Sequence, residues 1–151
     1  MTAGRGVVVV GIGQDVAGDD GVGLAVARVL GARGAAVRES ADASILLSLV
    51  EEGRRVVVID AVVGGAPGSV MRLDARALAS GPAPLSSHGI GVAEALELAR
   101  TLYGEGAVAR VEIVGVAIDR PAAGARIGLS PAVAAAVEPA AVLAASLVVG
   151  E

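Results

Sequence analysis

His88 is the only histidine in this chain of 151 residues, which contains no cysteine and no lysine. The missing cysteines exclude disulfides, thiol catalysis and thiolate metal sites. The missing lysines exclude a Walker phosphate loop and Schiff-base chemistry. A metal site in this chain must therefore be built from carboxylates and His88.

The first group of carboxylates lies in a glycine-rich segment, Gly11–Gly23, between a predicted strand and a predicted helix. A dinucleotide-binding loop is disfavoured there, because Val16 occupies the third glycine position of G-x-G-x-x-G. Asp19 and Asp20 would also repel a pyrophosphate at the start of the helix. One of the two aspartates could cap the helix, which leaves the other available for chemistry.

Asp60 follows the apolar run 56–59, which reads as a buried strand that ends at the aspartate. Ligand sites in open α/β sheets lie at the carboxyl ends of strands, so Asp60 is expected at the same edge as Asp20. His88 follows a long proline-containing loop and precedes a predicted helix. Two carboxylates and one imidazole would form a three-ligand site with open positions, which suits nickel or zinc better than calcium or magnesium.

Three other interpretations of these residues stay open. His88 could be a structural histidine, and Asp20 and Asp60 could be capping and solvated residues of an ordinary α/β ligand-binding domain. Ser86 or Ser87 could serve as a nucleophile beside His88. This last option is disfavoured, because neither serine lies in a G-x-S-x-G elbow and immediate chain neighbours rarely align as nucleophile and base.

Hydrophobic periodicity predicts alternating strands and helices. The continuous β-branched runs at 7–12 and 56–59 are typical of parallel strands buried on both faces. The pattern predicts strands at 7–12, 36–38, 56–59, 69–73 and 109–118, helices at 22–30, 44–52, 90–102 and from 131 onwards, and a loop at 75–87. Pro139 is expected to kink or restart the last helix. The α/β order predicts a single domain over 1–151, a three-layer α/β/α sandwich around a mostly parallel sheet, with 69–73 as an antiparallel edge strand beside its predecessor.

Composition narrows the possible partners. Apolar residues make up 54% of the chain, Tyr103 is the only aromatic residue, and the net charge is −4 with scattered arginines. These features disfavour binding to nucleic acid or to an anionic membrane surface. The apolar segment 131–149 is expected to be a buried terminal helix rather than a membrane span, since Glu138, Pro139 and Ser146 interrupt it. With no signal-peptide layout near Met1, a cytoplasmic location is the default expectation.

Several motifs, in order along nearly the whole chain, resemble those of the nickel-iron hydrogenase maturation endopeptidases. They are Gly11-Ile-Gly13 with Gly18-Asp-Asp-Gly-Val-Gly23, Val58-Ile-Asp-Ala61, Ser87-His-Gly-Ile-Gly91, Ile113-Val-Gly-Val116, and Ile127-Gly-Leu-Ser-Pro131 with Val137-Glu-Pro139. Each motif is weak alone, but their order and spacing are specific. The resemblance implies a twisted five-stranded sheet between helices and an endopeptidase that trims the carboxyl-terminal extension of the hydrogenase large-subunit precursor.

The resemblance also implies that Asp20, Asp60 and His88 bind metal and carry the cleavage. The ion would be nickel already loaded in the precursor, and zinc or another divalent ion could replace it in the isolated protein. Whether the enzyme is aspartyl-type or metal-dependent stays open. The chain departs from the family pattern at Gln14 and in the segment Glu39–Ser44. If the second of these touches the substrate, substrate choice is expected to differ. The alternative is a non-catalytic metal or nickel-protein binding module of the same fold.

Overall fold

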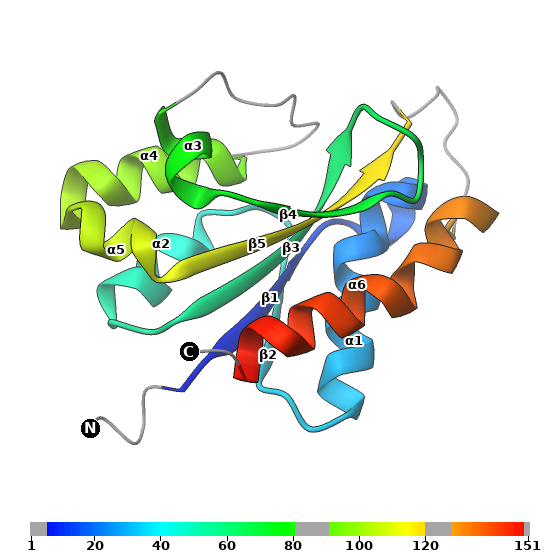
Figure 1. Ribbon diagram of the computed structural model, residues 1–151, viewed down its shortest axis with the longest axis horizontal. Coiled ribbons are helices and arrows are strands. Elements are labelled where there is room, and N and C mark those ends of the chain that lie inside the picture. The colour runs from blue at the N-terminus through cyan, green and yellow to red at the C-terminus, as the bar shows by residue number, and fades with distance from the viewer. Residues whose placement is uncertain (1–5, 81–90, 120–127, 150–151) are drawn as a thin grey trace.

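The computed structural model describes residues 6–80, 91–119 and 128–149 (Figure 1). Its centre is a five-stranded sheet in the order β2-β1-β3-β5-β4. The strands are β1 (Val8–Ile12), β2 (Val37–Ser40), β3 (Val56–Val63), β4 (Val70–Leu73) and β5 (Val111–Ile118). All neighbouring pairs are parallel except β4 and β5, which are antiparallel. The predicted α/β class, five-stranded sheet and antiparallel edge strand are therefore confirmed.

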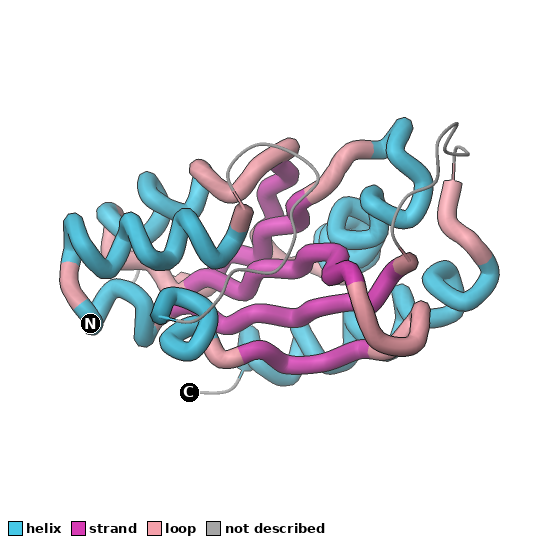
Figure 2. The backbone as a smooth tube through the Cα atoms, turned by 90° about the horizontal axis from the view of Figure 1, so that it is seen from above, coloured by secondary structure: helices cyan, strands magenta, loops and turns pink. Residues whose placement is uncertain are grey.

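Helices surround this sheet, as Figure 2 shows for the backbone seen from above. The 3-10 helix η1 (Asp15–Gly21) leads from β1 into α1. The α-helices are α1 (Val22–Ala32), α2 (Ile45–Glu51), α3 (Ala75–Ser80), α4 (Val92–Tyr103), α5 (Glu105–Ala109) and α6 (Pro131–Val149). Buried side chains of α1 and α6 form one core with the sheet, and those of α2, α3, α4 and α5 form another.

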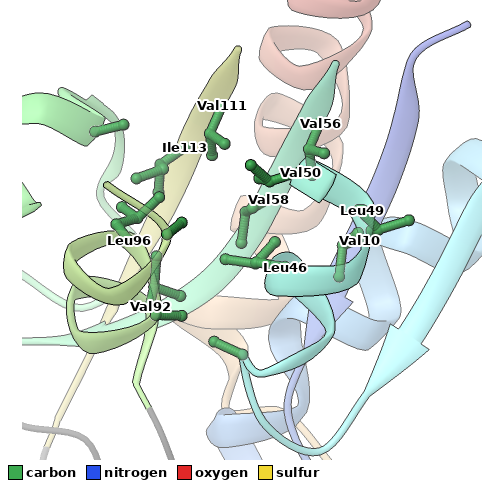
Figure 3. Packing of buried hydrophobic residues seen from close by; sticks show 14 of the residues in the cluster. Val10, Leu46, Leu49, Val50, Val56, Val58, Val92, Leu96, Val111 and Ile113 are labelled. Atoms are coloured by element: carbon green, nitrogen blue, oxygen red, sulfur yellow. The ribbon is translucent and has the colours of Figure 1, made fainter. Parts of the chain in front are cut away.

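Strand residues alternate between the two cores, because successive side chains of a strand point to opposite faces. Val56 and Val58 of β3 belong to the core shared with α2 and α4, whereas Val57 and Ile59 belong to the core shared with α1 and α6. Figure 3 shows the first of these cores, in which side chains of α2 and α4 pack over strand residues such as Val58. Both faces are thus covered by aliphatic side chains, as continuous apolar strands require.

Several sequence-based boundaries are wrong. Residues 75–80 of the predicted loop form α3, and α5 precedes β5 where no helix was expected. Asp60 does not end its strand, because β3 continues to Val63. β4 pairs with β5 rather than with β3, its predecessor in the chain. Helix α6 starts at Pro131 as predicted, but it does not restart at Pro139, which lies inside one continuous helix.

Helix α6 packs against α1, β3 and β5. It is the one helix in the described ranges that is long and apolar enough to cross a membrane by length and composition alone. Its buried face consists of small residues and one valine, namely Val133, Ala136, Ala140, Ala141 and Ala144. Outside the core, Arg33 and Glu138 join α1 to α6 through a salt bridge of 2.7 Å. The hydrogen bond from Arg33 is the main cause that lowers the pKa of Glu138 from its ordinary value of 4.5.

Candidate active site

Asp20 is the only buried charged residue in the part of the chain that the structure describes, with 6% of its surface exposed. It lies near the end of η1, the 3-10 helix that follows the carboxyl end of β1. Carboxylates are rarely buried in proteins, because removing their charge from water costs free energy unless partners compensate. A buried carboxylate at this edge of a parallel sheet therefore marks the region as a candidate site.

Close backbone packing holds Asp20 over the end of β1. A side chain at Gly13 would collide with the backbone carbonyl oxygen of Asp20, and one at Gly11 would collide with that of Gly23. A Cβ atom at Gly23 would itself lie 2.5 Å from the carbonyl oxygens of Ile12 and Ile59. These glycines let η1 and the first turn of α1 approach the end of β1 and the middle of β3.

Asp60 lies on the same part of the sheet. The parallel register pairs Gly11 of β1 with Ile59 of β3, so Asp60 is level with the last residue of β1. Beyond this point β3 continues beside β5 alone, where Asp60 pairs with Gly115. Asp60 is partly buried, and alternation along β3 places it on the face covered by α4. The packing of Gly23 against Ile59 therefore brings the segment that carries Asp20 close to the strand position of Asp60.

The two adjacent aspartates of η1 have different roles. Asp19 accepts two hydrogen bonds from Ser130, one from the backbone N–H at 2.6 Å and one from the hydroxyl at 2.8 Å. Ser130 directly precedes α6, so Asp19 is bound to the start of the last helix and not to that of α1, whose N-cap residue is Gly21. The expectation that one aspartate caps α1 is wrong for Asp19, which instead binds a partner 111 residues away that local sequence patterns do not reveal.

The segment Glu39–Ser44, which departs from the family pattern, lies on the other side of β1. The carbonyl oxygen of Ser40 accepts a hydrogen bond from the N–H of Gly13 at 3.0 Å, so β2 ends beside the candidate site. Asp42 then accepts hydrogen bonds from the N–H and hydroxyl of Ser44 at the start of α2. Glu39 forms a salt bridge of 2.7 Å with Arg28. The influence of the segment Glu39–Ser44 on substrate choice stays a prediction.

His88 lies outside the described residues, as do Ser86 and Ser87. The structure thus places two of the three predicted site residues, Asp20 and Asp60, at one edge of the sheet. Within the described ranges, no three aspartate, glutamate or histidine side chains are grouped closely enough to hold a metal ion. The three-ligand site therefore stays a prediction that needs His88.

Comparison with known proteins identifies the family. Residues 41–147 match the family model described as hydrogenase maturation protease. A comparison with curated proteins by sequence gives no significant match.

Solved structures agree with the family model. The chain is similar to the [NiFe] hydrogenase maturation protease HybD from Thermococcus kodakarensis, with 25% identity, a TM-score of 0.71, and coverage of 95% of this chain and 99% of that one. It is also similar to the hydrogenase maturating endopeptidase HybD from E. coli, with 23% identity, a TM-score of 0.69, and coverage of 96% of this chain and 94% of that one. For the maturation protease HycI from Thermococcus kodakarensis KOD1, the identity is 22% and the TM-score is 0.66, with coverage of 95% of this chain and 90% of that one. The family model covers well over half of the sequence, and the chain therefore belongs to the hydrogenase maturation proteases, a family of endopeptidases.

Proposed function

We propose that this protein is the endopeptidase that removes the carboxyl-terminal extension of a nickel-iron hydrogenase large-subunit precursor after nickel insertion. Family membership supports the reaction class. The observation that carries the proposal within this chain is the burial of Asp20 in η1, which packs over the end of β1, where Asp60 of the adjacent strand is level with Ile12. The cytoplasm as the site of this reaction stays a prediction.

We further propose that Asp20, Asp60 and His88 bind the nickel of the precursor. Two carboxylates and an imidazole supply oxygen and nitrogen donors without sulfur, a set that suits nickel or zinc and leaves further positions for the substrate. The reach of His88 is compatible with this role. Val92, the first residue of α4, packs in the same core as Val58. The four peptide units that join His88 to Val92 span at most ~14 Å.

Substrate and enzyme would then share one ion. Such an ion can polarise the scissile carbonyl or activate a water molecule. The second oxygen atom of a carboxylate that binds the ion through one oxygen, in Asp20 or Asp60, can accept the proton of the attacking water. The burial of Asp20 excludes bulk water from one side of the site, which strengthens the electrostatic interaction of its carboxylate with a cation.

Cleavage of the precursor tests this proposal. Nickel-loaded and nickel-free forms of the same precursor are incubated with the wild-type protein, and the products are measured by mass spectrometry. We expect a shortened product from the nickel-loaded form alone, and none with Asp60→Asn, which removes the charge but keeps the shape. Asp74→Asn is the matched control, because exposed Asp74 caps α3 outside the site.

The results separate the proposal from its alternative. A folded wild-type protein that retains the nickel-loaded precursor without cutting it would identify a binding module instead. Equal cleavage by Asp60→Asn and wild type would remove Asp60 from the site.

A further inference from the structure

We propose that Asp19 and Ser130 form a latch that positions the carboxylate of Asp20. This inference rests on the proposed metal site, of which Asp20 is one ligand. Asp19 is a positioning residue in this scheme, because both of its oxygen atoms are already hydrogen-bonded to Ser130.

The need for a latch follows from the local sequence. Asp19 and Asp20 lie between Gly18 and Gly21, and Gly18 has a positive φ of 62°. Glycines allow many backbone conformations, so a segment flanked by two of them loses much conformational entropy when it is fixed. The contact of Gly13 with the Asp20 carbonyl limits the segment from the side of β1. The hydrogen bonds of Asp19 to Ser130 restrict the same segment from the side of α6.

Ser130 is a suitable anchor because the helix that follows it is fixed by the core. Val133 and Ala136, in the first turns of α6, are buried against β5 and its neighbours. Gly68, in the connection between β3 and β4, approaches the carbonyl oxygen of Ala132 so closely that a Cβ there would lie 2.6 Å from it. The start of α6 is therefore held from two sides, and Figure 1 shows it at the same end of the sheet as η1.

The geometry of the latch separates two roles for Asp19. Asp19 directs one carboxylate oxygen to the N–H and the other to the hydroxyl of Ser130, so both oxygens are directed at the start of α6. Asparagine at position 19 can replace both bonds, because its carbonyl accepts from the N–H and its amide donates to the hydroxyl oxygen. Alanine can replace neither. If Asp19 only positions Asp20, asparagine should preserve metal binding and alanine should weaken it. If the charged carboxylate of Asp19 coordinates the metal, both substitutions should weaken metal binding.

The test is a calorimetric titration of the isolated full-length chain with Ni²⁺, beside a thermal melt of each variant. Residues that orient metal ligands typically contribute a factor of roughly 10–100 in metal affinity, so Asp19→Ala is expected to weaken Ni²⁺ binding by about that factor. Asp19→Asn is expected to stay within about threefold of wild type. Ser130→Ala, which keeps the backbone donor and removes the hydroxyl, is expected to lie between them. Asp74→Asn, another aspartate at a helix start, is the control.

Non-additivity gives the sharpest readout. If Asp19 acts through Asp20, then Asp19→Ala should cause little further loss of affinity in an Asp20→Asn background, although it would still lower the melting temperature. Folded Asp19→Ala protein with wild-type affinity would overturn the latch and leave the metal site intact. The latch would also be overturned if Asp19→Asn bound Ni²⁺ as weakly as Asp19→Ala, because the charge of Asp19 would then be needed and Asp19 would be a ligand. Wild-type affinity in Asp20→Asn would overturn both the latch and the proposed site. If Asp19→Ala does not fold, Ser130→Ala decides, and unchanged affinity in that variant contradicts the latch.

Discussion

Substitution of Gly23 by alanine tests how closely α1 must approach the sheet. The added methyl group would lie 2.5 Å from the carbonyl oxygens of Ile12 and Ile59, well inside ordinary contact distance. Both oxygens belong to the backbone of strands that pair with each other, so neither can move without disturbing the ladder of β1 and β3. Relief must therefore come from a shift of the helix start, which carries Asp20 with it.

The expected cost follows from two opposing effects. Overpacking a closely packed contact typically costs 1–3 kcal/mol, and alanine regains up to about 1 kcal/mol over glycine within a helix. Gly23 is the second residue of α1, where this gain is smaller, so a net loss of about 2 kcal/mol in the free energy of unfolding is expected. For a chain of this size that corresponds to a melting temperature lower by about 4–8 °C.

The assay is thermal unfolding followed by circular dichroism, with Gly106→Ala as the control. Gly106 lies in α5, and a Cβ atom there would meet nothing within 4 Å. The control should melt at the wild-type temperature or slightly above it, because only the helix propensity changes. A Gly23→Ala protein that melts as high as its control would refute the close packing of α1 against the backbone of Ile12 and Ile59.

Three further predictions concern the site and its surroundings. His88→Ala should abolish precursor cleavage while the melting temperature changes little, since coordination and not core packing is its proposed role; an unfolded variant would make His88 structural. Isolated protein should bind nickel or zinc more tightly than magnesium in calorimetry, because the donor set contains an imidazole; a preference for magnesium would contradict the site. Glu138→Gln should lower the melting temperature slightly above pH 4.5 and not in strong acid, because a depressed pKa stabilises the fold only while the carboxylate is charged. High salt should remove that difference, and a difference that persists would exclude the exposed Arg33 pair as its cause.

The sequence was sufficient to predict the layers of the fold, because each long element has a clear hydrophobic period. β1 and α1 differ from their predicted ranges by two residues at most at either end. The extent of β3 and the presence of α3 and α5 were not predicted. Asp60 looked like a strand end because it is charged, yet β3 passes through it and continues beside β5. α3 and α5 have six and five residues, too few to show a helical period.

The candidate site was predictable in its residue types but not in its supports. Both aspartates were expected at one sheet edge from the connection of strands to loops, and the structure places the residues Asp20 and Asp60 near the carboxyl end of β1. The partner of Asp19 was not predictable, because Ser130 comes near it only through the docking of α6 on α1 and the sheet. The contact of Gly23 with Ile59 likewise depends on the register of two strands.

One measurement tests the shared site most directly, namely the location of nickel in a crystal of the protein. Crystals soaked with Ni²⁺ are measured on both sides of the nickel absorption edge, and the anomalous difference map locates the ion. We expect one main peak at the carboxyl end of β1, about 2.0–2.2 Å from carboxylate oxygens of Asp20 and Asp60 and from a ring nitrogen of His88. A crystal in which nickel binds elsewhere, with the carboxylates of Asp20 and Asp60 turned away from each other, would contradict it.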